Sequence, residues 1–214
     1  MALCQATKET FVASSEMRVN DQANHWFDRT HGPMARVTLK AAPARGEIAL
    51  RQARRGDAST LRALLDRLDR ETPYLGFVPG ERSPHFLATQ QQIIEDPTEA
   101  NGAIFLTFSG ADAVGFLQAE VCPLLRYRHC LTIAIGVLQT HAGAGIGRRL
   151  FEAAEAWARA RRIHRLELTV ATHNERAIAL YMKSGFAIEG RLRHAVVVDG
   201  QYVDDYMMAK LIDS

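Results

Sequence analysis

Three glycines at alternate positions, Gly143, Gly145 and Gly147, separate an apolar run from an amphipathic segment. The run Leu131–Val137 is typical of a buried strand, and the segment Ile146–Arg161 has the spacing of a helix. Such a turn places free backbone amides and the positive end of a helix at the exit of a strand. The turn is therefore a candidate site for an anionic ligand.

Two known glycine-rich phosphate loops fit this turn poorly. A nucleotide P-loop needs Gly-Lys followed by Ser or Thr, and no glycine of the turn precedes that pair. A dinucleotide fingerprint reads G-x-G-x-x-G, whereas this turn reads G-x-G-x-G. Its later acidic residue would be Glu167, which falls in the middle of a predicted strand. The structural alternative, small residues that let a helix pack closely on a sheet, stays open for the turn taken alone.

Three titratable side chains of the surrounding predicted elements could move a proton. Tyr181 lies in the next predicted helix, and a phenol with a pKa of about 10 can donate a proton at neutral pH. Glu120, late in a predicted strand, and His129, at the start of another, could accept one. Each also has a structural interpretation: Tyr181 could fill a helix–sheet interface, and the other two could be solvated groups at strand ends. A relay through water would leave no trace in the sequence.

Helices that would position these groups can be identified from spacing. After the turn, apolar residues recur at steps of three and four and form one stripe. They are Ile146, Leu150, Ala153, Ala154, Trp157 and Ala158. The charged residues occupy the other face, and among them Glu155 is spaced to pair with Arg159. The next helix begins after Asn174, a good N-cap, and ends before Gly185.

The rest of the pattern predicts a mixed α/β domain. A strand at Glu47–Ala53 precedes a helix that Asp57 caps and that runs to about Arg70, and a second helix covers Phe86–Glu95. The further predicted strands are Ala103–Phe108, Ala113–Val121, His129–Val137, Leu166–Val170, Phe186–Val198 and Gln201–Leu211. Asp199-Gly200 is a strong hairpin turn between the last two.

Composition excludes several classes of function. The chain has 47% hydrophobic residues and a net charge of +2, which is too mild to favour nucleic-acid binding. No run is long enough for a membrane span. Cys122 and Cys130 are expected to be core thiols rather than a disulfide, and no Cys/His spacing predicts a metal site. These features favour a cytoplasmic protein without a metal.

The first part of the chain, residues 1–44, has no clear hydrophobic period. It lacks the apolar core of a secretory signal, and its acidic residues argue against a transit peptide. We predict a poorly ordered N-terminal extension there, followed by one domain at residues 45–214.

Three motifs together resemble the GNAT N-acetyltransferase superfamily. In that family Q/R-x-x-G-x-G/A follows the fourth strand and binds the pyrophosphate of acetyl-CoA, and the matching segment here is Ala142–Gly147. The second match is N-E-R-A-I-A-L-Y at Asn174–Tyr181, followed by G-F, and the third is E-G…D-G-x-Y-x-D…M at Glu189–Met208. The resemblance covers roughly residues 47–211. It is closest to bacterial amino-acid N-acyltransferases and ribosomal-protein acetyltransferases.

The resemblance implies a single mixed, mostly antiparallel sheet of about seven strands, flanked by four helices, and acetyl-CoA as co-substrate. The acetyl-CoA contacts that it implies are Ile135, Val137, Gly143, Gly145, Ile146, Gly147, Arg148, Asn174 and Tyr181. In the family the strand that carries Ile135 and Val137 splays from the next strand, and its amides bind pantetheine and polarise the thioester. Tyr181 matches the general acid near the CoA sulfur, and we assign Glu120 as a candidate base.

One departure from the family pattern is plain. Ala142 stands where the family usually has Gln or Arg. The main-chain amides of the turn survive that change, but one side-chain contact is lost. We expect Arg148 and Arg149 to supply charge in its place.

The connection Glu71–Phe86, dense in Pro, Gly and aromatic residues, borders the acceptor pocket in the family pattern. Tyr74, Phe77 and Glu71 are therefore candidates for substrate choice, and an equal alternative is that they anchor a loop. We expect acetyl transfer to a primary amine, either a small molecule such as an amino acid or polyamine, or a protein N-terminus. We expect no nucleic-acid or membrane partner and leave a homodimer open. Because of Ala142, and because Leu131–Val137 contains no acid, the alternative is a non-catalytic member that binds CoA or a partner protein.

Overall fold

The computed structural model describes residues 47–96 and 101–213, and structural statements below concern these residues. The predicted N-terminal extension, residues 1–44, lies outside them and stays a prediction. The elements are β1 (Ile48–Gln52), α2 (Ala58–Glu71), the 3-10 turn η2 (Pro73–Leu75), α3 (Pro84–Glu95), β2 (Gly102–Ser109), β3 (Asp112–Val121), β4 (Cys130–Val137), the 3-10 turn η3 (Gln139–His141), α4 (Ile146–Arg159), β5 (Arg165–Ala171), α5 (Glu175–Lys183), β6 (Ala187–Val198) and β7 (Gln201–Leu211). The predicted order is confirmed, and the bounds shift by only one or two residues.

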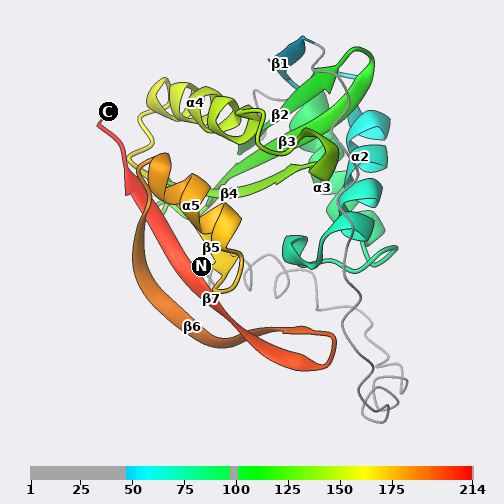
Figure 1. Cartoon of the computed structure of the whole chain (residues 1–214). Helices are drawn as coiled ribbons and strands as arrows, with labels where there is room; N and C mark the ends of the chain where they lie inside the picture. The colour runs from blue at the N-terminus through cyan, green and yellow to red at the C-terminus, as the bar shows by residue number, and fades with distance from the viewer. Residues whose placement is uncertain (1–46, 97–100, 214) are drawn as a thin grey trace, which may run out of the picture. The chain divides into compact units, whose positions relative to one another are not determined.

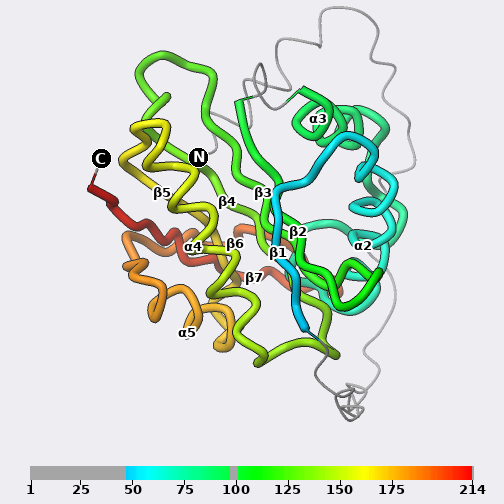
Figure 2. Tube along the Cα trace, turned by 90° about the horizontal axis from the view of Figure 1, so that it is seen from above, coloured from blue at the N-terminus to red at the C-terminus, as the bar shows by residue number. Residues whose placement is uncertain are grey.

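The strands form a seven-stranded sheet in the order β1-β2-β3-β4-β5-β7-β6. All neighbours are antiparallel except β4 and β5, which run parallel. Helices α2 and α3 cover one face of the sheet, and α4 and α5 cover the other (Figures 1 and 2). The mixed, mostly antiparallel sheet flanked by four helices that the sequence predicts is thus confirmed.

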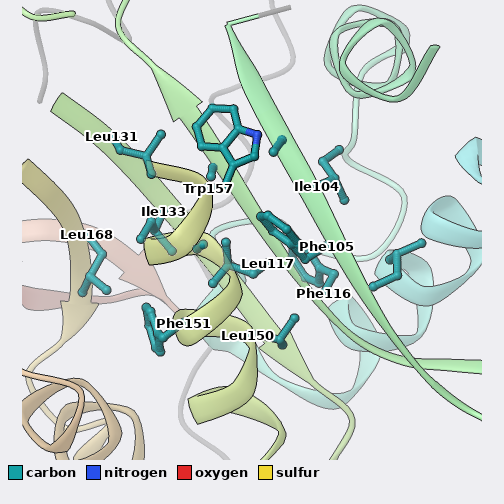
Figure 3. Close-up of a cluster of buried hydrophobic side chains, with 14 of the residues drawn as sticks. Ile104, Phe105, Phe116, Leu117, Leu131, Ile133, Leu150, Phe151, Trp157 and Leu168 are labelled. Carbon is teal, nitrogen blue, oxygen red and sulfur yellow. The ribbon is translucent and has the colours of Figure 1, made fainter. Parts of the chain in front are cut away.

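The core under α4 explains why this helix forms where it does. Leu150 and Trp157, from the predicted stripe, are buried in one cluster with Leu117 and Ile133 of the sheet (Figure 3). The prediction missed Phe151, whose side chain is only 1% exposed. Burying a large aromatic side chain contributes about 2 to 3 kcal/mol to folding.

Glu155 is a correction to the predicted surface of α4. Spacing places it on the solvated face, but it is 9% exposed. The ammonium group of Lys210, on β7, donates to one carboxylate oxygen of Glu155, and Arg159 donates to the other at 3.3 Å. A carboxylate can be buried at this position because a cation reaches it from a strand far away in the sequence.

Asp57 is a second correction. The predicted stripe of α2 is buried, and Asp57 does precede the helix, but its side chain caps no helical amide. It accepts instead from the Arg51 guanidinium at 2.5 and 3.0 Å and from the Arg54 amide at 2.6 Å. The hydrogen bond from Arg51 is the main reason that the pKa of Asp57 is lowered.

Cys122 and Cys130 are both buried and free, as expected for core thiols. Among the described residues, no helix is long and apolar enough to cross a membrane. The same residues contain no group of three side chains that could hold a metal ion.

Candidate functional site

A gap opens in the middle of the sheet. β4 and β5 pair only at Cys130↔Arg165, Leu131↔Leu166 and Thr132↔Glu167. The rest of β4, residues 133–137, keeps its pairing with β3 and has no partner in β5. The sheet therefore splits along one side of β4, as the family resemblance implies.

The free main-chain groups of β4 face this gap. The amide of Leu138 donates to the Val114 carbonyl of β3 at 2.9 Å. Because hydrogen-bonding directions alternate along a strand, the amides of Val137 and Ile135 point to the opposite side, toward β5. They are free to bind an extended ligand there.

The glycine turn lies where this gap ends. Gly143 and Gly145 have φ of 83° and 76°, a region that favours glycine. Gly145 is also the N-cap of α4, so no side chain caps the first turn of that helix. A Cβ on Gly145 would meet no atom of the described residues within 4 Å, which leaves open space beside the free amides. This geometry suits a phosphate group, because donors, helix dipole and space coincide.

Ile146 and Gly147 combine this role with packing. The Ile146 side chain is 2% exposed, so only its main chain can face a ligand. A Cβ on Gly147 would lie 2.6 Å from Leu180 Cδ2, so its missing side chain lets α4 and α5 approach closely. Only the amides of these two residues remain candidates for binding.

The arginines near the turn differ in what they contact. Arg148 Nε donates to Glu152 Oε1 at 2.8 Å, and Arg149 Nη1 donates to the Ile48 carbonyl of β1 at 2.9 Å. The arginine whose guanidinium lies over the turn is Arg176 of α5, which the sequence argument missed. Its Nη2 is 3.8 Å from the position of a Cβ on Gly143.

Asn174 performs its predicted local role. Its Oδ1 accepts from the Ala177 amide at 3.2 Å, which confirms the N-cap of α5. The side-chain nitrogen donates to no group among residues 47–96 and 101–213, so it can still reach a ligand.

Tyr181, at the end of α5, presents a buried ring and an open hydroxyl. The ring is 8% exposed and packs edge-on against Phe151 at 5.7 Å and beside Phe186 at 6.2 Å. Its hydroxyl has no hydrogen-bond partner among the described residues. In that part of the chain, the side-chain polar atom that is both fully enclosed and without a partner is Trp157 Nε1, and the Tyr181 hydroxyl does not belong to this class. The Tyr181 hydroxyl is therefore not sealed. Burial raises the pKa of this phenol well above its ordinary value, so it stays protonated and remains a donor.

Glu120 lies at the closed end of the gap. It stands opposite Thr132, the last β4 residue that pairs with β5. Gln118 Nε2 donates to its carboxylate, and Gln118 Oε1 accepts from Gln90 of α3 at 2.7 Å. His129 lies before β4, where its carbonyl accepts the amides of residues 164 and 165, far along the strand from the glycine turn. By strand register Glu120 lies beside the closed end of the gap, whereas His129 lies outside β4.

Turn η2 crosses the gap on the α2/α3 face. Leu75 Cδ1 is 3.5 Å from the position of a Cβ on Gly136 of β4. The Tyr74 ring lies 5.3 Å from the ring of His173, which follows β5. Tyr74 is 43% exposed, so it remains available to a substrate.

Glu71 and Phe77, also predicted to shape substrate choice, have anchoring contacts. Glu71 Oε2 accepts the Gln139 amide at 3.0 Å, which ties α2 to η3. The Arg82 guanidinium lies over the Phe77 ring, 4.3 Å from the ring centre. Arg82 also donates to buried Asp69 through two hydrogen bonds of 2.7 Å. The connection is therefore held rigidly on both sides of Tyr74.

Asp205 is a second residue that the sequence argument missed. It stands opposite Ala171, the last residue of β5, and it is half-buried. Desolvation raises its pKa, Asp204 adds to that rise, and His173 opposes it. The sequence signal that could have located Asp205 is the alternation of side chains along a strand, which places it on the same face of β7 as Met207 and Ala209.

Comparison with known proteins identifies a family and a relative with similar sequence. The model of the acetyltransferase (GNAT) family matches residues 61–186. L-amino acid N-acetyltransferase AaaT of Escherichia coli (strain K12) is 35% identical over 104 residues, which are 47% of this chain and 62% of AaaT. This chain thus spans less than two thirds of that relative.

Solved structures agree on the fold. A GNAT acetyltransferase of Streptococcus pneumoniae is 29% identical, with a TM-score of 0.71 over 78% of this chain and 100% of its own. The structure of yncA from Salmonella typhimurium with its cofactor acetyl-CoA is 17% identical, with a TM-score of 0.68 over 78% of this chain and 94% of its own. At that identity the second match concerns the fold alone. From the family match and the fold together, the chain belongs to the acetyltransferase (GNAT) family.

Proposed function

We propose that the protein transfers the acetyl group of acetyl-CoA to a primary amine. The observation that carries the proposal is the continuity of the donor site: the gap beside β4 runs directly into the uncapped glycine turn. An extended arm with amide groups fits the gap, and a diphosphate fits the turn. AaaT, an L-amino acid N-acetyltransferase, and spermidine N-acetyltransferase of Vibrio cholerae, solved with CoA and spermine, act on or bind amines.

Acetyl-CoA would supply the activated thioester, and the chain would hold it by its main chain. The amides of Gly143, Gly145, Ile146 and Gly147 would bind the diphosphate, and Asn174 would contribute its side-chain nitrogen. The amides of Ile135 and Val137 would hold the pantetheine arm and donate to the carbonyl oxygen as negative charge develops there. One donor of this kind is worth roughly 3 kcal/mol of transition-state stabilisation.

Proton transfer would involve groups on both faces of the sheet. Tyr181 would give its hydroxyl proton to the departing thiolate from the α5 side. Glu120, oriented by Gln118, would take the proton of the amine from the α2/α3 side, directly or through water. The acceptor amine would then enter from the α2/α3 face, between η2 and the end of β5.

Asp205 is well placed to contact that amine as an ammonium group. Its carboxylate shares a corner with Tyr74 and His173, beside the mouth of the gap. We expect Asp205→Asn to lower kcat/KM for the amine about tenfold, the effect of one charge-assisted hydrogen bond. Acetyl-CoA affinity should not change, because the donor site lies elsewhere.

The pH dependence of kcat/KM provides a second test of the role of Asp205. Burial raises the pKa of Asp205, and only the ionised form attracts an ammonium group. In the wild type, kcat/KM should therefore rise as pH increases through this raised pKa, and Asp205→Asn should lack that step. Asp112→Asn, an exposed acid in the β2–β3 turn, is the matched control. A step that persists in Asp205→Asn would assign it to another group.

The direct test of the function is release of free CoA thiol with a panel of amines. Amino acids, polyamines and peptides with free N-termini belong in it, because each class is compatible with the family. Acetyl-CoA binding by calorimetry comes first, since a chain that binds none at high micromolar concentration has no donor site. Binding without turnover of any amine would favour the non-catalytic alternative, which Ala142 motivates.

Two further parts of the proposal concern the protein as a whole. β6 forms the edge of the sheet, and it is exposed along nearly all its length. Because an unpaired edge can add another strand, a homodimer through β6 is part of the proposal, and light scattering in solution would test it.

The buried free thiols Cys122 and Cys130 fit a reducing compartment such as the cytoplasm.

A further inference from the structure

We propose that Arg176 binds the diphosphate of CoA and replaces the side-chain contact that the family has at the position of Ala142. This inference rests on the proposed function, because it concerns the same donor site. The main chain of the glycine turn carries no cation, and Arg176, in the first turn of α5, would supply one to the diphosphate.

The first argument is position. Arg176 Nη2 lies 3.8 Å from where a Cβ of Gly143 would be, so the guanidinium stands over the turn that carries the free amides. A phosphate on those amides would be within reach of a guanidinium on the same side, and guanidinium forks match phosphate oxygens well.

The second argument is that the arginines predicted for this role have other contacts. Arg149 donates to the Ile48 carbonyl of β1, on the far side of α4. Arg148 is paired with Glu152 one helical turn further on. Arg176 has no hydrogen bond or ion pair with any residue that the structure describes, so its charge is not committed to the fold within that part of the chain.

The third argument is energetic. The first turn of a helix favours acids such as Glu175 and disfavours cations, because the helix dipole is positive there. Arg176 therefore weakens α5 slightly, and its place is not explained by helix stability. With a bound anion, the effect of Arg176 on stability becomes favourable, because the guanidinium, the α4 amides and the helix dipoles would then all face negative charge.

Arg176→Gln separates this assignment from that of a solvated surface arginine. We expect CoA affinity in calorimetry to fall about ten- to a hundredfold, as for loss of a hydrogen bond to a charged group. The melting temperature of the free protein should be unchanged or slightly higher, because an unfavourable charge leaves the first turn. A solvated arginine predicts unchanged affinity.

The matched control is Lys183→Gln, which removes one exposed positive charge from the other end of the same helix. Its CoA affinity should equal that of the wild type. Arg176→Lys should recover part of the affinity, because it keeps the charge and loses the fork. Equal losses in Arg176→Gln and Lys183→Gln would overturn the proposal, since they would indicate only a long-range charge effect.

Truncated ligands identify the phosphate. Dephospho-CoA lacks the 3′-phosphate and keeps the diphosphate, so the ratio of wild-type to Arg176→Gln affinity should persist with it. Loss of the ratio with dephospho-CoA would move the contact to the 3′-phosphate and overturn the diphosphate assignment. If the wild type binds neither ligand, the proposed function fails; if the wild type and Arg176→Gln bind both equally, this inference alone fails.

Discussion

Gly145→Glu is expected to lower the affinity for acetyl-CoA by more than about a hundredfold while the chain still folds. The variant puts a carboxylate into the open space beside the free amides of α4. Two like charges about 4 Å apart near a protein surface repel each other by roughly 4 kcal/mol. The new acid would also interact with the helix dipole in place of the ligand.

The structure shows which control this experiment needs. Gly145 has φ of 76°, so any other residue introduces strain of roughly 1 to 2 kcal/mol. Gly145→Ala carries the same strain without the charge, and its methyl group would meet no neighbouring atom. Calorimetry with acetyl-CoA and thermal melting of both variants separate the two effects. Comparable affinities for the Ala and Glu variants would exclude the turn as the diphosphate site.

Tyr181→Phe is expected to reduce turnover by about ten- to a thousandfold, a range that overlaps general acid catalysis. The variant keeps the ring that packs against Phe151 and Phe186 and removes only the donor. The hydroxyl has no hydrogen-bond partner among the described residues, so the melting temperature should change little. Acetyl-CoA affinity should also persist within a few-fold.

Single-turnover kinetics provide the measurement, because they report the chemical step without product release. Tyr202→Phe is the matched control: this tyrosine is 65% exposed on the β6–β7 hairpin, where its ring stacks on that of His194. The raised pKa of Tyr181 places its deprotonation above the ordinary range, so wild-type activity should not fall with pH where a free phenol would ionise. Full single-turnover activity in Tyr181→Phe would remove the acid role and leave the proton to solvent.

Local chemistry explains which parts of the fold could be predicted. The Asn174 cap, the Asp199-Gly200 turn and the stripe of α4 each depend on residues within one or two helical turns of each other. Asp57 and Glu155 were misplaced because their partners, Arg51 of β1 and Lys210 of β7, belong to strands outside the two helices. The spacing of residues within one helix does not reveal partners that lie outside that helix.

The same distinction divides the candidate site. The donor side is nearly contiguous in the sequence, so the strand, the glycine turn and the helix of Tyr181 could be predicted together, and the family resemblance implied the gap beside β4. The acceptor corner joins Tyr74 from the α2–α3 connection, His173 from the end of β5 and Asp205 from β7. Only the fold brings these three segments together, and no motif in any one of them reveals the others.

The gap beside β4 has a consequence for the stability of the protein in the cell. Residues 133–137 of this central strand have no partner in β5, so this side of the strand resembles a sheet edge. A ligand that completes this ladder stabilises the folded state alone, by about 2.7 kcal/mol when present at a hundred times its dissociation constant. Under the proposed function, the thermal stability of the protein would then rise with the concentration of acetyl-CoA in the cell.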